Sequence, residues 1–205
     1  MRILKKEFQN DMKNPEVIII ESKKTAFASK CKITKDQRSG YMRAKGEEGI
    51  MLRKEREIND FAEIVDVLKR CDTIRIAMQG EDYPYVVPVS FGMQVIDDIV
   101  TLYFHGPHRG RKFELLQKQP KVCVEGDIFL KVEPTSYGIT TRYESVIGFG
   151  TVEPTTGEEK VHGLRAITEH YGFPAYPLER CKGLAAASVY KITLTELTGK
   201  RNKSN

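Results

Sequence analysis

Short segments rich in β-branched and aromatic residues dominate the chain after residue 70, and turn residues separate them. Helices interrupt this series only twice, so the segments do not alternate with helices as parallel βαβ units require. A mainly β fold, in which an antiparallel barrel carries helices at its ends, fits this order better than a doubly wound parallel sheet. The six predicted strands are Thr73–Met78, Tyr85–Met93, Ile99–His105, Val122–Leu130, Tyr143–Val152 and Ala187–Leu197.

Three segments carry the apolar spacing of helices. In Glu55–Arg70 the apolar residues recur every three or four positions, which places them on one helical face. Shorter helices are predicted over Arg111–Gln119 and over Gly157–Tyr171, and Gly172 ends the second. We therefore expect helices that flank the barrel.

Residues 1–50 differ from the rest of the chain in charge. They hold 12 of the 33 Lys and Arg residues but only 7 of the 28 Asp and Glu residues, so the whole net charge of +5 arises there. We predict a basic extension over 1–50, with one short strand at Val17–Ile20, and a single domain over 51–205. Acidic residues interrupt the basic ones and no aromatic residues are interleaved, so a solvated extension is favoured over nucleic-acid binding.

The cysteines indicate a reducing compartment. Cys31, Cys71, Cys123 and Cys181 are widely spaced and form no CxxC pair, so neither a zinc site nor a dithiol redox site is predicted. A cytoplasmic location is the simplest account. The first residues lack the apolar core of a signal peptide and no run of 18 apolar residues occurs, so no association with a membrane is expected.

The segment Tyr103–Lys112 is a candidate anion site. An alternating strand ends there in a turn that contains Gly106 and Gly110, and a predicted helix follows. The free N–H groups at a helix start favour an anion, and arginine can bind phosphate with two parallel hydrogen bonds. Without further information, a phosphate site and a basic turn facing solvent are equally supported. The cations of this segment are Arg109, Arg111 and Lys112.

Other features of the predicted strands are compatible with a bound ligand but can also be explained without one. Pro88 lies inside a strand and donates no backbone hydrogen bond, which fits either a plain edge strand or a strand that runs along a ligand. The glycines of Tyr143–Gly150 fit either a close approach by a ligand or a barrel corner. His105 is placed either to bind a cofactor or to be satisfied by backbone. With His108 it forms an HxxH pair, but the neighbouring cations disfavour a metal.

Several motifs in order resemble a known family. They resemble the Nim-type nitroimidazole-resistance proteins, which belong to the pyridoxamine-5′-phosphate-oxidase-like FMN-binding split barrels, over about residues 51–200. The resemblance implies a six-stranded antiparallel split β-barrel with flanking α-helices. The motifs are Arg53–Ile58, Pro84–Gly92, Tyr103–His105 followed by Gly110–Lys112, and Pro120–Glu125.

The resemblance also implies a cofactor, a partner and a site. It implies a homodimer with FMN at the subunit interface, in which Gly110, Arg111 and Lys112 hold the FMN phosphate. The flavin ring would lie beside one strand, with His105 near it, and two residues of another strand would line the site from the same or the partner subunit. The strand residues are Val87, Pro88, Val89, Ser90 and Phe91, and the other two are Ser145 and Val146.

Three functions remain open at this point. The first is an FMN-dependent oxidoreductase that passes electrons from a small-molecule donor to a small organic acceptor such as a nitroimidazole or nitroaromatic compound. The second is a flavin-binding or flavin-storage protein without turnover, because no GxSxG, HExxH, P-loop or GxGxxG pattern occurs and no general acid or base is obvious. The third is a nucleic-acid-associated regulator. Relatives of this kind also hold heme or a deazaflavin, so these cofactors stay open.

Overall fold

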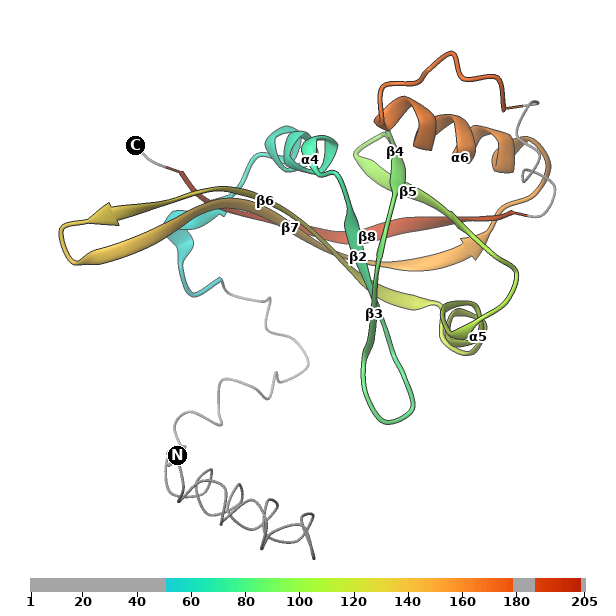
Figure 1. Ribbon diagram of the computed structural model, residues 1–205, viewed down its shortest axis with the longest axis horizontal. Helices are drawn as coiled ribbons and strands as arrows, with labels where there is room; N and C mark the ends of the chain where they lie inside the picture. The colour runs from blue at the N-terminus through green and yellow to red at the C-terminus, as the bar shows by residue number, and fades with distance from the viewer. Residues whose placement is uncertain (1–50, 179–186, 204–205) are drawn as a thin grey trace, which may run out of the picture. The chain divides into compact units, whose positions relative to one another are not determined.

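The computed structural model describes residues 51–178 and 187–203. The predicted extension over 1–50, with its strand at Val17–Ile20, lies outside the described residues, as do Cys31 and Cys181. In the described part, strands dominate and three α-helices flank them (Figure 1). A short 3-10 turn, Lys54–Arg56, precedes the first strand. Over these residues no helix is both long and apolar enough to cross a membrane.

The strands form one antiparallel sheet in the order β3-β2-β6-β7-β8-β5-β4, and β1 pairs with β8. The two ends of this order, β3 and β4, are joined by a single residue, Ser90. The sheet therefore curls until its first and last strands meet at one corner, and the predicted split barrel is confirmed. The strands are β1 (Glu57–Ile58), β2 (Ile74–Met78), β3 (Tyr85–Val89), β4 (Phe91–Ile96), β5 (Ile99–Gly106), β6 (Lys121–Thr135), β7 (Gly138–Pro154) and β8 (Ser188–Asn202).

The described residues contain eight strands where the sequence predicts six. The predicted strand Tyr85–Met93 is two strands that change direction at Ser90, and the two-residue β1 was not predicted. The hairpin β6–β7 is also longer than expected and projects beyond the other strands (Figure 1). Pro134 lies within β6. It is tolerated because the pairing of β6 with β2 ends at Gly126, beyond which β6 is an edge strand.

The first helix begins later than its apolar spacing predicts. Helix α4 spans Phe61–Arg70, because the Asp60 carboxylate accepts hydrogen bonds from the N–H groups of Ala62 at 2.7 Å and Glu63 at 3.4 Å and so caps the helix there. Ile58, assigned to the helical face by its spacing, instead pairs with β8. The other two helices are confirmed, as α5 (Arg111–Lys118) and α6 (Gly157–His170).

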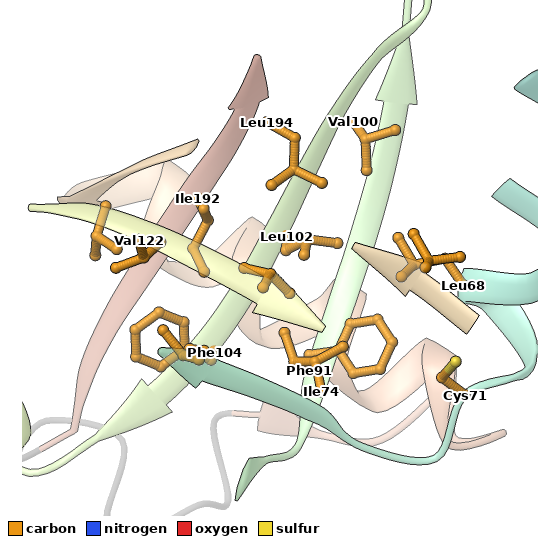
Figure 2. Close-up of a cluster of buried hydrophobic side chains, with 14 of the residues drawn as sticks. Leu68, Cys71, Ile74, Phe91, Val100, Leu102, Phe104, Val122, Ile192 and Leu194 are labelled. Atoms are coloured by element: carbon orange, nitrogen blue, oxygen red, sulfur yellow. The ribbon is translucent and has the colours of Figure 1, made fainter. Parts of the chain in front are cut away.

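Apolar side chains from both ends of the chain fill the barrel (Figure 2). Phe91, Phe104 and Ile192, from three different strands, have no measurable exposure. Helix α6 lies against β4 and β5 so closely that a Cβ at Gly92 would stand 2.3 Å from the carbonyl carbon of Ala166. This packing holds β5 firmly, and β5 carries the candidate anion turn at its end.

Candidate functional site

A groove of about 500 Å³ opens where β3 and β5 end and α5 begins. The barrel assembles it because Phe91 pairs with Phe104 across β4 and β5, which brings the Ser90 corner beside His105. The predicted phosphate turn and the proline-containing strand therefore meet in space, although they are separate in the sequence. The lining residues are Pro88, Val89, Ser90, His105, Gly106, Pro107, Lys112 and Ala187.

Lys112 supplies the positive charge of this groove. Its side chain is half-buried, and its Nζ lies 5.0 Å from the centre of the Phe104 ring. A Cβ at Gly106 would stand 3.1 Å from that Nζ, so glycine lets the lysine lie closely across the end of β5. Burial lowers the pKa of Lys112, because part of its hydration is lost. A hydrogen bond to an anion in the groove would replace the hydration that the ammonium group of Lys112 loses on burial.

The start of helix α5 adds hydrogen-bond donors beside Lys112. Its N-cap is Gly110, which has φ 102° and no side chain with which to cap the first turn. Helix α4 differs, because the Asp60 carboxylate satisfies two of its first N–H groups. The first turn of α5 therefore presents backbone N–H groups and the positive end of the helix dipole without a side-chain acceptor. Together with Lys112, this donor set suits a phosphate.

His105 stands in the groove as a largely neutral ring. The groove removes part of its hydration and the charge of Lys112 is close, and both effects lower its pKa below the ordinary value. A neutral imidazole offers one donor and one acceptor. The ring can therefore orient a polar edge of a bound cofactor near neutral pH without adding charge.

Arg111 points away from this groove. Its guanidinium carbon lies 4.9 Å from the centre of the Tyr85 ring, toward the β2–β3 turn, and Arg111 does not line the groove. It is exposed to solvent. Three cations were predicted near the phosphate turn. Among the described residues that line the groove, Lys112 is the only one of the three.

The remaining predicted site residues are divided between the groove and the core. Pro88, Val89 and Ser90 line the groove, and Gly110 begins the neighbouring helix. The side chains of Phe91 and Val146 are buried in the barrel core, and that of Val87 packs against it. Within one chain, these three side chains do not reach the groove.

Ser145 lies on the outer face of β7 with two exposed apolar neighbours. Residues two apart share a face of a strand, so Ser145 is aligned with Ile147 and Phe149, which are 43% and 46% exposed. The strand register extends this apolar surface, because Phe149 pairs with Cys123, Cys123 with Ala77, and Ala77 with Val86. We call the residues Val86, Ala77, Cys123, Phe149 and Ile147 the outer apolar row.

Sequence reasoning missed several parts of this site. Ala187 lines the groove but was not assigned to it, and Gly106 and Pro107 were predicted only as parts of the turn and not as contact residues. The outer apolar row was also missed, although the alternation of Ile147 and Phe149 with glycines in β7 was a signal that both faces of this strand are apolar. The described residues contain no cluster of three or more His, Cys, Asp or Glu side chains that could hold a metal.

A family model for pyridoxamine 5′-phosphate oxidase matches residues 60–201. The chain belongs to the pyridoxamine 5′-phosphate oxidase family. The match begins at the N-cap of α4 and ends within β8, so it covers the barrel and all three described helices. No curated protein matches the sequence.

Solved structures agree with this membership. A candidate 5-nitroimidazole antibiotic resistance protein from Bacteroides thetaiotaomicron is 29% identical, with a TM-score of 0.63 over 71% of this chain and 86% of that one. Two more distant structures are the flavocytochrome Anf3 from Azotobacter vinelandii (19% identity, TM-score 0.63, 76% of this chain and 73% of that one) and the FAD and heme binding protein from Mycobacterium smegmatis (22% identity, TM-score 0.61, 73% and 74%). These two share the fold.

Proposed function

We propose that this protein binds FMN in the groove between β3, β5 and α5 and acts as an FMN-dependent oxidoreductase toward a small organic acceptor, such as a nitroaromatic compound. The observation that carries the proposal is the half-buried Lys112 beside the uncapped first turn of α5. Family membership and the flavin named in two structural neighbours support the choice of a flavin. The nitroimidazole-resistance neighbour supports the choice of acceptor.

The donor set fits the phosphate end of FMN. A phosphate dianion would accept from the Lys112 ammonium group and from the first N–H groups of α5, and it would lie at the positive end of the helix dipole. Gly110 leaves room for a close approach of the phosphate to the backbone, because a Cβ there would meet nothing within 4 Å. Arg111, which is exposed and close to the groove in sequence, would add long-range attraction or swing from Tyr85 onto the phosphate.

The groove residues would orient the ring system and limit its contact with water. Pro88 and Val89 present an apolar wall, and Ser90 and His105 place polar atoms at its end. A bound flavin would supply the reversible electron transfer, which none of these side chains provides. The protein would therefore contribute position, polarity and access, which agrees with the absence of any hydrolase signature.

We also propose that the active form is a homodimer in which the outer apolar row faces a second copy. Val86, Ile147 and Phe149 are large apolar side chains exposed on one face of the sheet, with Ala77 and Cys123 between Val86 and Phe149, and monomers rarely leave such a surface uncovered. Pro88 shares that face with Val86 and also lines the groove. A partner seated on the row would therefore lie against the groove, and its Ser145 would be close to the cofactor of the other subunit.

The dimer is tested by a charge placed in the row. Phe149→Asp should convert a dimer to a monomer in light-scattering measurements after gel filtration, because a buried unpaired carboxylate is costly. Ile96→Asp is the matched control, since Ile96 is 56% exposed on β4 outside the row. A wild-type protein that is monomeric at micromolar concentration would overturn this part of the proposal.

Flavin binding is tested by the visible absorption spectrum of the purified protein and by the mass of any cofactor released on denaturation. FMN is expected, whereas released heme, FAD or a deazaflavin would replace it in the proposal. Protein that is colourless and gains no flavin absorbance after incubation with FMN would overturn the proposal entirely.

A second function, flavin binding without turnover, is favoured by one observation. The described groove residues include one imidazole, His105, and its lowered pKa makes it a poor proton donor near neutral pH. The two functions differ in steady-state oxidation of reduced nicotinamide with a nitroaromatic acceptor. Sustained turnover supports the oxidoreductase, and a holoprotein that is reduced once but never recycles supports storage.

A further inference from the structure

A second cavity, of about 470 Å³, lies on the other side of the loop 106–110 from the flavin groove. The end of β7, the start of α6, the start of β8 and one face of α5 enclose it. Ala187 lines both spaces. Its volume is in the range of sites that hold small organic ligands.

The floor of this cavity is apolar and partly aromatic. Phe113 and Leu116 of α5 face Tyr190 of β8 across it, whereas the Val189 side chain points to the opposite face of β8 and packs with Leu164 and Leu178. Leu116, Val189 and Tyr190 are each less than 10% exposed, and Tyr190 is held by stacking on Phe104 with ring centres 5.1 Å apart. A preformed wall of this kind favours a flat apolar group.

The rim of the cavity is positively charged. Lys160 lines it, is half-buried, and has no carboxylate partner among the residues that the structure describes. Two of the neighbouring acids are already occupied, because Lys191 binds Glu159 at 2.8 Å and Glu153 at 3.6 Å, and the third, Glu158, is exposed to solvent. The N-cap of α6, Thr156, forms no side-chain cap, so the first turn of this helix also presents its N–H groups toward the rim. These features favour an anionic ligand.

A partly buried polar contact joins two walls of the cavity. Ser188 is 8% exposed, and its Oγ lies 2.5 Å from Nδ1 of His108. His108 belongs to the loop that separates the cavity from the flavin groove. The contact therefore ties the start of β8 to that loop and keeps the two spaces apart.

From these observations we infer that the cavity is a binding site for a small aromatic carboxylate, distinct from the flavin groove. The ring would lie on Phe113, Leu116 and Tyr190, and the carboxylate would bind the Lys160 ammonium group at the start of α6. The inference does not depend on which cofactor the groove holds, because the two sites use different cations, Lys160 here and Lys112 there.

The test uses indole-3-acetate and its neutral, nearly isosteric analogue indole-3-acetamide. The chain contains no tryptophan, so the fluorescence anisotropy of the indole reports binding without a protein background. Indole-3-acetate should bind at least about tenfold more tightly than the amide, because one charge-assisted hydrogen bond is lost with the charge. Equal affinity of the two probes, or binding of neither at millimolar concentration, would overturn the inference.

Variants locate the site. Lys160→Gln should weaken the binding of indole-3-acetate about tenfold and leave the affinity for the amide unchanged. Lys69 is an exposed lysine on α4 outside the cavity, and Lys69→Gln should change neither affinity. Circular dichroism confirms that each variant is folded. Saturating FMN should leave the affinity for indole-3-acetate within about twofold of its original value. Displacement of the probe by FMN, or an unchanged affinity in Lys160→Gln, would show that the anion binds elsewhere.

Discussion

Lys112 and Phe104 join the candidate phosphate site to the barrel core: the ammonium nitrogen lies 5.0 Å from the centre of a ring that has no exposed surface. An ammonium group over an aromatic face is attracted by the ring quadrupole, and this attraction strengthens when water is excluded. Lys112 is therefore held toward the groove before any ligand arrives, and less side-chain entropy remains to be lost when an anion binds.

The first prediction concerns this lysine. Lys112→Met should lower the affinity for FMN by at least about tenfold, because it removes a charge-assisted hydrogen bond to the phosphate. Riboflavin, which lacks the phosphate, should bind the variant and the wild type equally well. The measurement is quenching of flavin fluorescence on titration with protein. Lys118→Met, at the exposed end of the same helix, is the control. An equal loss for both flavins would show that Lys112 acts through packing.

A second prediction concerns a buried carboxylate away from the groove. Glu144 is 1% exposed on β7 and lies 2.8 Å from Nη1 of Arg70 and 2.7 Å from Nζ of Lys203. Glu144→Gln should lower the free energy of unfolding by about 1–3 kcal/mol, since it removes the negative charge shared by Arg70 and Lys203 and turns one acceptor oxygen into a donor. The midpoint of urea unfolding measures this. Asp66→Asn, which removes an exposed partner of Arg70, should cost less than about 1 kcal/mol.

The same carboxylate predicts an acid-sensitive stability. Burial alone would raise the pKa of Glu144, but the hydrogen bonds from Arg70 and Lys203 outweigh it, and the pKa lies below the ordinary value of 4.5. The stabilisation is therefore complete above the pKa of the unfolded chain and is lost as the pH falls through the lower folded-state pKa. Unfolding midpoints measured below pH 5 should fall less steeply in Glu144→Gln than in the wild type. Parallel slopes would assign the acid sensitivity to other carboxylates.

A fourth prediction concerns the corner at Ser90, where β3 and β4 join. The Tyr171 hydroxyl accepts a hydrogen bond from the Phe91 N–H group at 3.2 Å and donates one to the Asp72 carbonyl at 2.7 Å. Tyr171→Phe should lower the free energy of unfolding by about 1–2 kcal/mol. It should also lower the affinity for FMN, because the lost hydrogen bond holds Phe91, which directly follows the groove residue Ser90. An unchanged affinity for FMN in a destabilised variant would mean that the corner is held by other contacts.

Local patterns predicted most of the secondary structure, because each depends on residues close in sequence. The alternation in Ile99–His105 and the breaks at Gly106 and Gly110 identified β5, its turn and α5. The start of α4 was wrong because the apolar spacing of Ile58 fits a helix face as well as a strand paired with β8. Only the Asp60 cap and that distant partner decide between them.

The groove was partly predictable. Lys112 was identified from the strand, turn and helix that carry it, whereas the placement of His105 and Pro88 beside a cofactor rested on the family resemblance. The direction of the Arg111 side chain and the presence of Ala187 in the groove depend on how β2–β3 and β8 pack around α5, which no local pattern contains. The burial of the Val146 side chain follows from alternation in β7 once Ser145 is placed outside.

The long β6–β7 hairpin has a consequence for the order of folding. Its strands are neighbours in the sequence and pair from Lys121 to Thr135, so its formation closes only a short loop. The pairing of β5 with β8 joins distant parts of the chain and carries a larger loop-closure entropy. We therefore expect the hairpin in the folding nucleus and the β5–β8 seam beside the candidate groove among the last contacts to form, so that the groove exists only in the fully folded chain.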